Sequence, residues 1–153
     1  MSSARQLHAI DQLCARALRG HSADFAALEA LDALEALDAL DAAHVAELRR
    51  TDFDATDPGE YEDRCEQYAA ELAALHARLD GRWEAHGPFG LQGVLLRGGA
   101  GEEIPEPWHG LSWSASIADL WHTGDRWLAL AVTDREGPRL LRLLAVVTDV
   151  DPP

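Results

Sequence analysis

The stretch PGEYEDRCEQYAAELAALHARLDG, residues 58–81, decides the fold, because it joins the clearest helical pattern of the chain to a sharp end. Its apolar and aromatic positions recur at alternating spacings of four and three residues: Tyr61, Cys65, Tyr68, Leu72, Leu75 and Leu79. Such a seam is typical of a helix that buries one side against a partner surface, as in a coiled coil. Pro58 suits the first turn, and Asp80-Gly81 marks the end. We predict a helix over residues 58–80.

Two further helices are predicted upstream, over about residues 3–19 and about residues 23–50. The first has four apolar side chains on one face: Leu7, Ile10, Cys14 and Ala17. The second repeats Ala, Leu and an acid, with leucine at every third position from Leu28 to Leu40. A helix has about 3.6 residues per turn, so this repeat winds around the axis and gives no clean apolar side. Two interpretations stay open: an expanded codon block, or a helix contacted on several sides.

The loop that joins the second and third predicted helices is short, so we expect these helices to form an antiparallel hairpin. After Gly81 the texture of the sequence changes, and all five tryptophans lie between Trp83 and Trp127. Four apolar runs predict the strands of an antiparallel meander: residues 91–97, 111–122, 127–133 and 140–148. The last run, around residues 139–147, also fits a helix. We predict an α+β fold, helical over residues 1–80 and β over residues 81–153, in one structural domain.

The charge balance excludes some classes of partner. There are 27 acidic residues and 13 basic ones, all of them arginine, and the formal net charge is −14. Such a chain repels phosphate backbones and anionic lipids, and no basic stripe offsets this, so we expect neither nucleic-acid nor membrane binding. The sequence shows no signal-peptide pattern and no long apolar span, which predicts a cytoplasmic protein. Cys14 and Cys65 are predicted to be free thiols.

The acidic residues concentrate around the interhelical loop. Residues 24–63 contain 13 acids and two arginines. A hairpin tip with clustered carboxylates and one exposed aromatic residue is typical of a protein-docking surface, although charged loops are also commonly only solvated. The predicted partner-binding residues are Asp52, Phe53, Asp54, Asp57 and Glu60. The leading hypothesis is a non-enzymatic interaction or regulatory protein, such as an inhibitor, an immunity-type protein or an adaptor, that binds a basic protein. Self-association through the helix at residues 23–50 is the alternative partner.

A second hypothesis is a small-ligand-binding or metal-binding enzyme that uses the Trp-rich sheet. Two Trp-His pairs suggest His109 and His122 as its polar groups, and Glu106, Asp119 or Asp125 are the acids that could join them in a zinc or general-base site. Metal ligands usually stand at tighter spacings than these residues do. We therefore predict no catalytic residue, no metal and no cofactor, and we lean towards a protein that is not an enzyme.

The predicted layout is similar to that of bacterial transcript-cleavage factors, in which a helical hairpin with an acidic tip precedes a small β domain. The stretch from Asp52-Phe53 to Glu60-Tyr61 resembles their acidic tip. The resemblance implies a protein that binds RNA polymerase and whose tip carboxylates help to hold a catalytic metal. The fuller tip motif of the family is absent from this sequence, and the N-terminal helix is additional.

Overall fold

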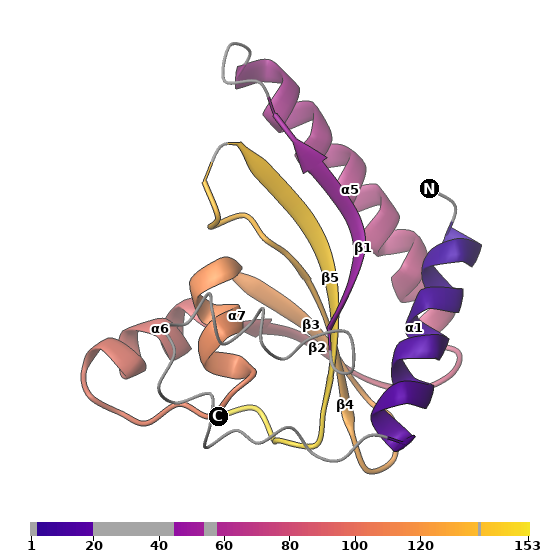
Figure 1. Ribbon diagram of the computed structural model, residues 1–153, viewed down its shortest axis with the longest axis vertical. Coiled ribbons are helices and arrows are strands. Elements are labelled where there is room, and N and C mark those ends of the chain that lie inside the picture. The colour runs from indigo at the N-terminus through magenta and orange to yellow at the C-terminus, as the bar shows by residue number, and fades with distance from the viewer. Residues whose placement is uncertain (1–2, 20–44, 54–57, 138) are drawn as a thin grey trace.

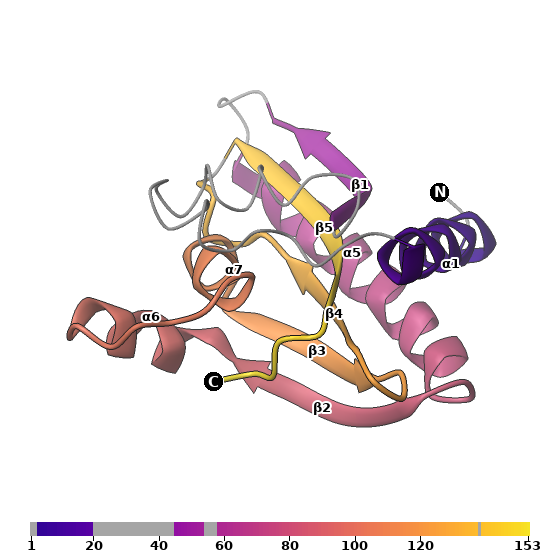
Figure 2. The ribbon, with the colours of Figure 1, turned by 60° about the horizontal axis from the view of Figure 1, so that its bottom comes forward.

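The computed structural model describes residues 3–19, 45–53, 58–137 and 139–153. These residues form four helices and one five-stranded antiparallel sheet with the strand order β1-β5-β4-β3-β2 (Figures 1 and 2). The helices are α1 (Ser3–Arg19), α5 (Pro58–Leu79), α6 (Leu91–Gly99) and α7 (Trp108–Ser114). The strands are β1 (Val45–Asp52), β2 (Glu84–Gly90), β3 (Ile117–His122), β4 (Trp127–Val132) and β5 (Leu140–Thr148). The α+β class with an antiparallel sheet agrees with the sequence.

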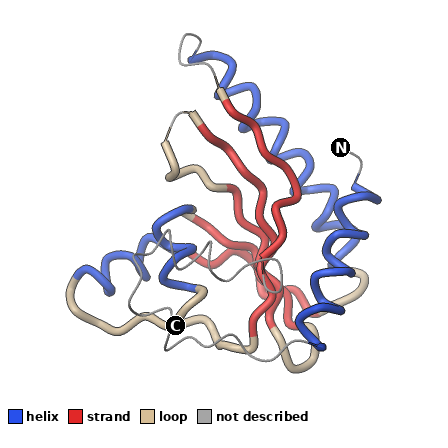
Figure 3. Tube along the Cα trace, in the orientation of Figure 1, coloured by secondary structure: helices blue, strands red, loops and turns tan. Residues whose placement is uncertain are grey.

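The sheet lies between two helical layers (Figures 1 and 3). Helices α1 and α5 cover one face, and α6 and α7 cover the other. Successive residues of a strand point to opposite faces, so each central strand contributes to both cores. In β3, for example, Trp121 packs in the core under α1 and α5, whereas Leu120 packs in the core under α7.

The predicted helices at residues 3–19 and 58–80 are confirmed as α1 and α5, but the seam of α5 has a different partner from the expected one. Tyr68, Leu75 and Leu79 are fully buried in the same core as the side chains of β4 and β5. Among the described residues, the seam therefore packs on the sheet and on α1. A sheet face offers the same continuous apolar surface that a second helix would have supplied.

The predicted helix over residues 23–50 is wrong at its C-terminal end, where Val45–Asp52 form strand β1. Residues 23–44, and with them the leucine repeat, lie outside the described residues. β1 pairs with β5 from Val45 opposite Val146 to Asp52 opposite Leu140. β5 is an apolar strand that is buried on both faces, and β1 supplies the backbone hydrogen bonds that its open edge would otherwise lack. The residues before the loop are thus not helical, so the hairpin on which the likeness to transcript-cleavage factors depends is not formed there.

Two of the four predicted strands are helical over part or all of their length. The predicted strand at residues 91–97 is α6, whose Leu91 and Val94 are buried three positions apart, a helical spacing. The prediction for residues 111–122 holds only from Ile117, because the residues before it form α7. Apolar runs this short have the same composition in buried helices and buried strands, so the sequence pattern could not separate the two.

The predicted strands at residues 127–133 and 140–148 are confirmed as β4 and β5, which settles residues 139–147 as strand. The remaining strand, β2, was missed because its sequence, EAHGPFG, contains residues typical of turns. Gly87 has a φ of 75°, and the pairing register with β3 shifts between Ala85 and Gly87. Pro88 has no N–H to donate, so this segment is compatible only with the edge of a sheet, which is where β2 lies.

Tyr68 links α5 to β1 and β5. Its side chain is fully buried, and its hydroxyl donates to the Leu141 carbonyl oxygen at 3.1 Å. The same hydroxyl lies 2.7 Å from the hydroxyl of Thr51 in β1. The guanidinium of Arg49 lies over the Tyr68 ring, 4.8 Å from its centroid, and pairs with Glu71 of α5. One phenol therefore ties the helix to two neighbouring strands.

We expect Tyr68→Phe to lower the free energy of unfolding by about 1–2 kcal/mol, because it leaves the buried Leu141 carbonyl without this donor. Urea denaturation followed by circular dichroism measures the change. The matched control is Tyr61→Phe, on the same helix. The Tyr61 hydroxyl interacts with the Cys65 thiol and, among the described residues, bonds to no strand carbonyl, so its loss should cost less than about 0.5 kcal/mol. Equal losses in the two variants would contradict this role of Tyr68.

Candidate functional site

Three of the predicted partner-binding residues, Asp52, Phe53 and Glu60, are described, and they lie where β1 ends and α5 begins, at one end of the molecule (Figure 1). Phe53 is only 9% exposed, and its ring packs against Tyr61 with the ring centroids 5.2 Å apart. Its N–H donates to the Arg139 carbonyl oxygen at 2.8 Å. The expectation of an exposed aromatic residue at this tip is therefore wrong, because Phe53 extends the core where β1 meets α5. Asp54 and Asp57 lie outside the described residues.

The carboxylates of this region form what we call the acidic corner: Asp52, Glu60, Glu62, Asp63 and Glu66. Asp52 is exposed and pairs with Arg50 at 3.2 Å. The other members lie in the N-terminal half of α5, where Glu62, Asp63 and Glu66 are exposed. In the described part of the chain these three carboxylates form no ion pair, and the neighbouring Arg64 donates to Gln67 instead. The acidic corner therefore combines one paired carboxylate, Asp52, with three exposed carboxylates of α5 that no described cation pairs with.

His109 of α7 lies in the most elaborate polar arrangement on the opposite side of the sheet. Its Nδ1 lies 3.1 Å from Oε1 of Glu106, a carboxyl that is only 8% exposed. Oε2 of Glu106 accepts the N–H of Gly110 at 3.1 Å. Burial raises the pKa of Glu106, although the Gly110 N–H and His109 both act to lower it. The acid that the sequence offered as a neighbour of His109 is therefore its actual partner.

Trp113, one helical turn after His109, covers the other side of the imidazole. Its indole N–H donates to Nε2 of His109 at 3.3 Å, and its side chain is among the most exposed large apolar groups, at 52%. With Trp113 donating to Nε2, the proton of a neutral His109 stands on Nδ1 and points to Glu106. The Nε2 lone pair of His109 thus accepts the indole N–H of Trp113, whose side chain is half exposed to solvent.

His122 does not join His109. It lies at the end of β3, where its ring packs against Trp127 with centroids 4.7 Å apart and faces His86 at 6.1 Å. Asp125, another acid considered from the sequence, lies in the turn after β3. The structure thus gives the two histidines separate surroundings instead of one polar site.

The structure also brings together a pair that the sequence did not suggest, His76 of α5 and Asp119 of β3. His76 Nε2 lies 3.2 Å from Oδ2 of Asp119, and its ring packs edge-on against Trp121 at 4.8 Å. The two residues are far apart in the chain, and no spacing rule connects a helix to the third strand of a sheet. Asp119 also lines an open groove of about 310 Å³, called here the α5 groove. It is lined by Leu72, Pro88, Ile117, Asp119, Val132 and Asp134.

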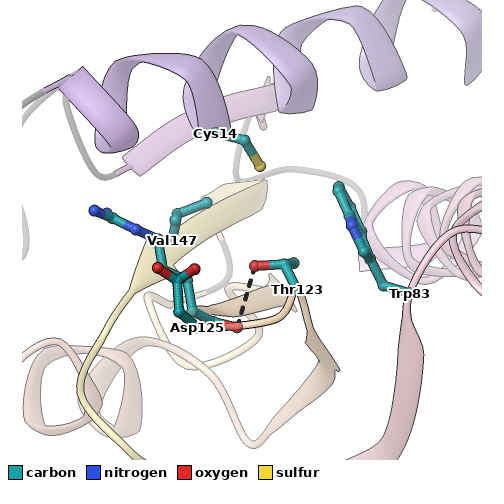
Figure 4. A pocket seen from close by; sticks show the side chains of 6 residues that line it. Cys14, Trp83, Thr123, Asp125 and Val147 are labelled. Carbon is teal, nitrogen blue, oxygen red and sulfur yellow. Dashed lines mark hydrogen bonds between the residues drawn. The ribbon is translucent and has the colours of Figure 1, made fainter.

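A second, smaller cavity of about 170 Å³ lies between α1 and the β3–β4 turn (Figure 4). Figure 4 shows Cys14 pointing from α1 into the space between Thr123 and Trp83. Burial, with a smaller contribution from Asp11, raises the pKa of the Cys14 thiol, so it stays protonated near neutral pH. A protonated thiol is a poor nucleophile, so nothing in this cavity points to a reactive cysteine. The remaining lining residues are Asp125, Arg126 and Val147.

Over the described ranges, no three His, Cys, Asp or Glu side chains come together as a set that could hold a metal ion. The described helices also include none that is long and apolar enough to cross a membrane. Comparison of the chain with protein-family models, with curated proteins and with solved structures finds no match. Any functional argument therefore depends on the geometry of this chain alone.

The buried Glu106 gives a pH-dependent prediction. A carboxyl with a raised pKa stabilises the fold fully below its ordinary pKa, and this stability is lost as the pH rises through the raised pKa. Glu106→Gln keeps an acceptor for the Gly110 N–H and carries no charge. We expect the variant to gain stability relative to the wild type between about pH 4 and about pH 7.5.

Urea denaturation of both proteins at the two pH values checks this expectation. Glu103→Gln removes an exposed carboxylate from the same loop and serves as the control, with a difference from the wild type that should not change with pH. A Glu106→Gln protein that loses stability relative to the wild type as the pH rises would show that the carboxylate is stabilised, not destabilised, by its site.

Proposed function

We propose that this chain is a non-enzymatic interaction protein of the inhibitor, immunity or adaptor type, and that it binds a basic protein partner through the acidic corner. The observation that carries the proposal is the set of exposed, unpaired carboxylates Glu62, Asp63 and Glu66 beside Asp52 at the junction of β1 and α5. Charge of one sign gathered on a rigid element accelerates encounter with a partner of the opposite sign and disfavours other partners. The net charge of −14 supports the same direction of steering.

The proposed surface differs in one respect from the surface expected from the sequence. The surface is the corner between a strand and a helix rather than the tip of a helical hairpin. Asp52 and Glu60 remain part of it, and Phe53 supports it from the core instead of offering an exposed anchor. Asp54 and Asp57, which the sequence places in the same loop, stay members of the proposed surface. Self-association through residues 23–50 stays a separate prediction about residues outside the described part.

The experiment compares two variants that lose the same number of charges. The corner variant carries Glu62→Gln, Asp63→Asn and Glu66→Gln, and the control variant carries Glu84→Gln, Glu103→Gln and Asp149→Asn, all exposed acids elsewhere. Each protein is immobilised and used to capture partners from an extract of the cells that produce it, followed by quantitative mass spectrometry. We expect the corner variant to capture about tenfold less of the basic partner than the wild type does.

The control variant should retain the partner, because it keeps the local field at the corner. Equal loss from the two variants would mean that only net charge matters, and unchanged capture by the corner variant would mean that the acidic corner contacts solvent alone. Either result contradicts the proposal.

A second candidate function, small-ligand binding or general-base chemistry, is favoured by the Glu106–His109 pair beneath Trp113. The oriented Nε2 lone pair is the group that such chemistry would use. Acylation by diethyl pyrocarbonate, quantified by mass spectrometry, measures its reactivity. We expect His109 to react several-fold faster in the Trp113→Phe variant than in the wild type, because the variant has no indole N–H to occupy Nε2 of His109. The exposed His8 should be unaffected. An unchanged rate at His109 would contradict this arrangement.

A further inference from the structure

The α5 groove exists because α5 crosses the sheet obliquely. Near its middle, Tyr68 contacts β1 and β5, and about two turns later His76 contacts β3. The helix therefore leaves part of the same sheet face uncovered where β2 and β3 lie. Ile117 at the start of β3 is 53% exposed there, which is unusual for a large aliphatic side chain. The groove encloses about 310 Å³ along this uncovered flank.

Two carboxylates stand in otherwise apolar walls. Asp119 is largely buried, with its side chain 14% exposed, and its Oδ2 faces His76. Asp134 accepts the Ser116 N–H through Oδ1 at 2.9 Å. Among the described residues nothing donates a hydrogen bond to the second oxygen of either carboxylate, and no arginine lines the groove. The walls are supplied by Leu72, Pro88, Ile117 and Val132.

The α5 groove and the acidic corner share helix α5. Tyr61 and Cys65 lie among the corner acids, about three and about two helical turns before Leu72, which lines the groove. Burial raises the pKa of the Cys65 thiol, and the carboxylate of Asp134 contributes to the same direction. Burial and the carboxylate of Asp134 also raise the pKa of the Tyr61 hydroxyl. Asp134 is thus within electrostatic reach of the N-terminal half of α5, and a protein seated on the acidic corner would have the groove beside it.

We propose that the α5 groove receives an arginine side chain of the partner protein. This inference rests on the proposed function and names the anchor of its interface. The aliphatic stem of arginine fits the apolar walls, and its guanidinium N–H groups match the two unused carboxylate oxygens. The volume lies at the small end of the roughly 300–1,000 Å³ of ligand pockets, which suits one side chain better than a helix or a strand.

The first experiment uses N-acetyl-arginine N-methylamide as the probe and the citrulline analogue, which has the same shape without the charge, as its control. Binding is followed by NMR through the methyl groups of Leu72, Ile117 and Val132. We expect saturable shifts at these methyl groups, with the citrulline analogue binding at least about tenfold more weakly. Equal binding of the two compounds, or no shift at these methyl groups, would overturn the proposal.

Two isosteric variants locate the binding. Asp119→Asn and Asp134→Asn keep acceptors for His76 and for the Ser116 N–H, so the fold should persist, and each should weaken arginine binding by about threefold to tenfold. Glu103→Gln, an exposed acid outside both the groove and the acidic corner, should leave it unchanged. Equal weakening by Glu103→Gln would show that the cation is held diffusely by the charged surface, and this too would overturn the proposal.

The last experiment separates the groove from the acidic corner. The double variant Asp119→Asn/Asp134→Asn replaces the corner variant in the capture experiment, and we expect it to lose the partner about tenfold. Arginine binding in the groove together with unchanged capture would overturn the assignment of the groove to the partner. The proposed function itself is decided independently, by the corner variant and its charge-matched control.

Discussion

Strand β5 is buried on both faces, and most of the architecture follows from this constraint. Its alternate side chains enter two separate cores, with Leu141 and Leu143 under α1 and α5, and Leu144 and Val146 under α7. A strand of this kind needs helical cover on both sides and a hydrogen-bonding partner along both edges. β4 supplies one edge by a hairpin, and β1 returns from the N-terminal half of the chain to supply the other. The two halves of the sequence are thereby joined in one sheet.

The sequence revealed those elements whose pattern is long or whose connection is local. α5 was predictable because its seam repeats over more than five turns, and the β4–β5 hairpin because two apolar runs flank a turn. β1 was hidden because it follows a leucine-rich repeat that favours a helix, and its own alternation is broken by a bulge between Glu47 and Arg49. β2 was hidden by Gly87 and Pro88, which an edge strand accepts and a central strand excludes.

The candidate sites divide along the same line. Glu106 and His109 are near neighbours on one short segment, so their pairing could be anticipated from the sequence. His76 and Asp119 meet only because α5 crosses β3, and the burial of Phe53 depends on the return of β1 beside β5. Both facts are consequences of long-range topology, which residue spacing does not encode. The concentration of acids in this region, in contrast, is a property of composition, which the sequence shows directly.

The two faces of the molecule consequently differ in character. The face with α5 has carboxylates and an open groove, whereas the face with α6 and α7 contains the buried Glu106 paired with His109 and the half-exposed Trp113. Helix α5 therefore covers one core and also determines which way the charged surface faces relative to the sheet.

The edge strand β2 has one more consequence, which concerns the behaviour of many copies of the chain together. An open sheet edge is a template on which a strand of another molecule can add, and repeated addition leads to fibres. In β2 the backbone bulges at Gly87, and Pro88 removes a donor, so the row of hydrogen-bonding groups is interrupted at its centre. The opposite edge strand, β1, also has a bulge, and its charged residues are Glu47, Arg49, Arg50 and Asp52. Bulges, a proline and charged side chains are features that oppose the addition of a further strand from another copy.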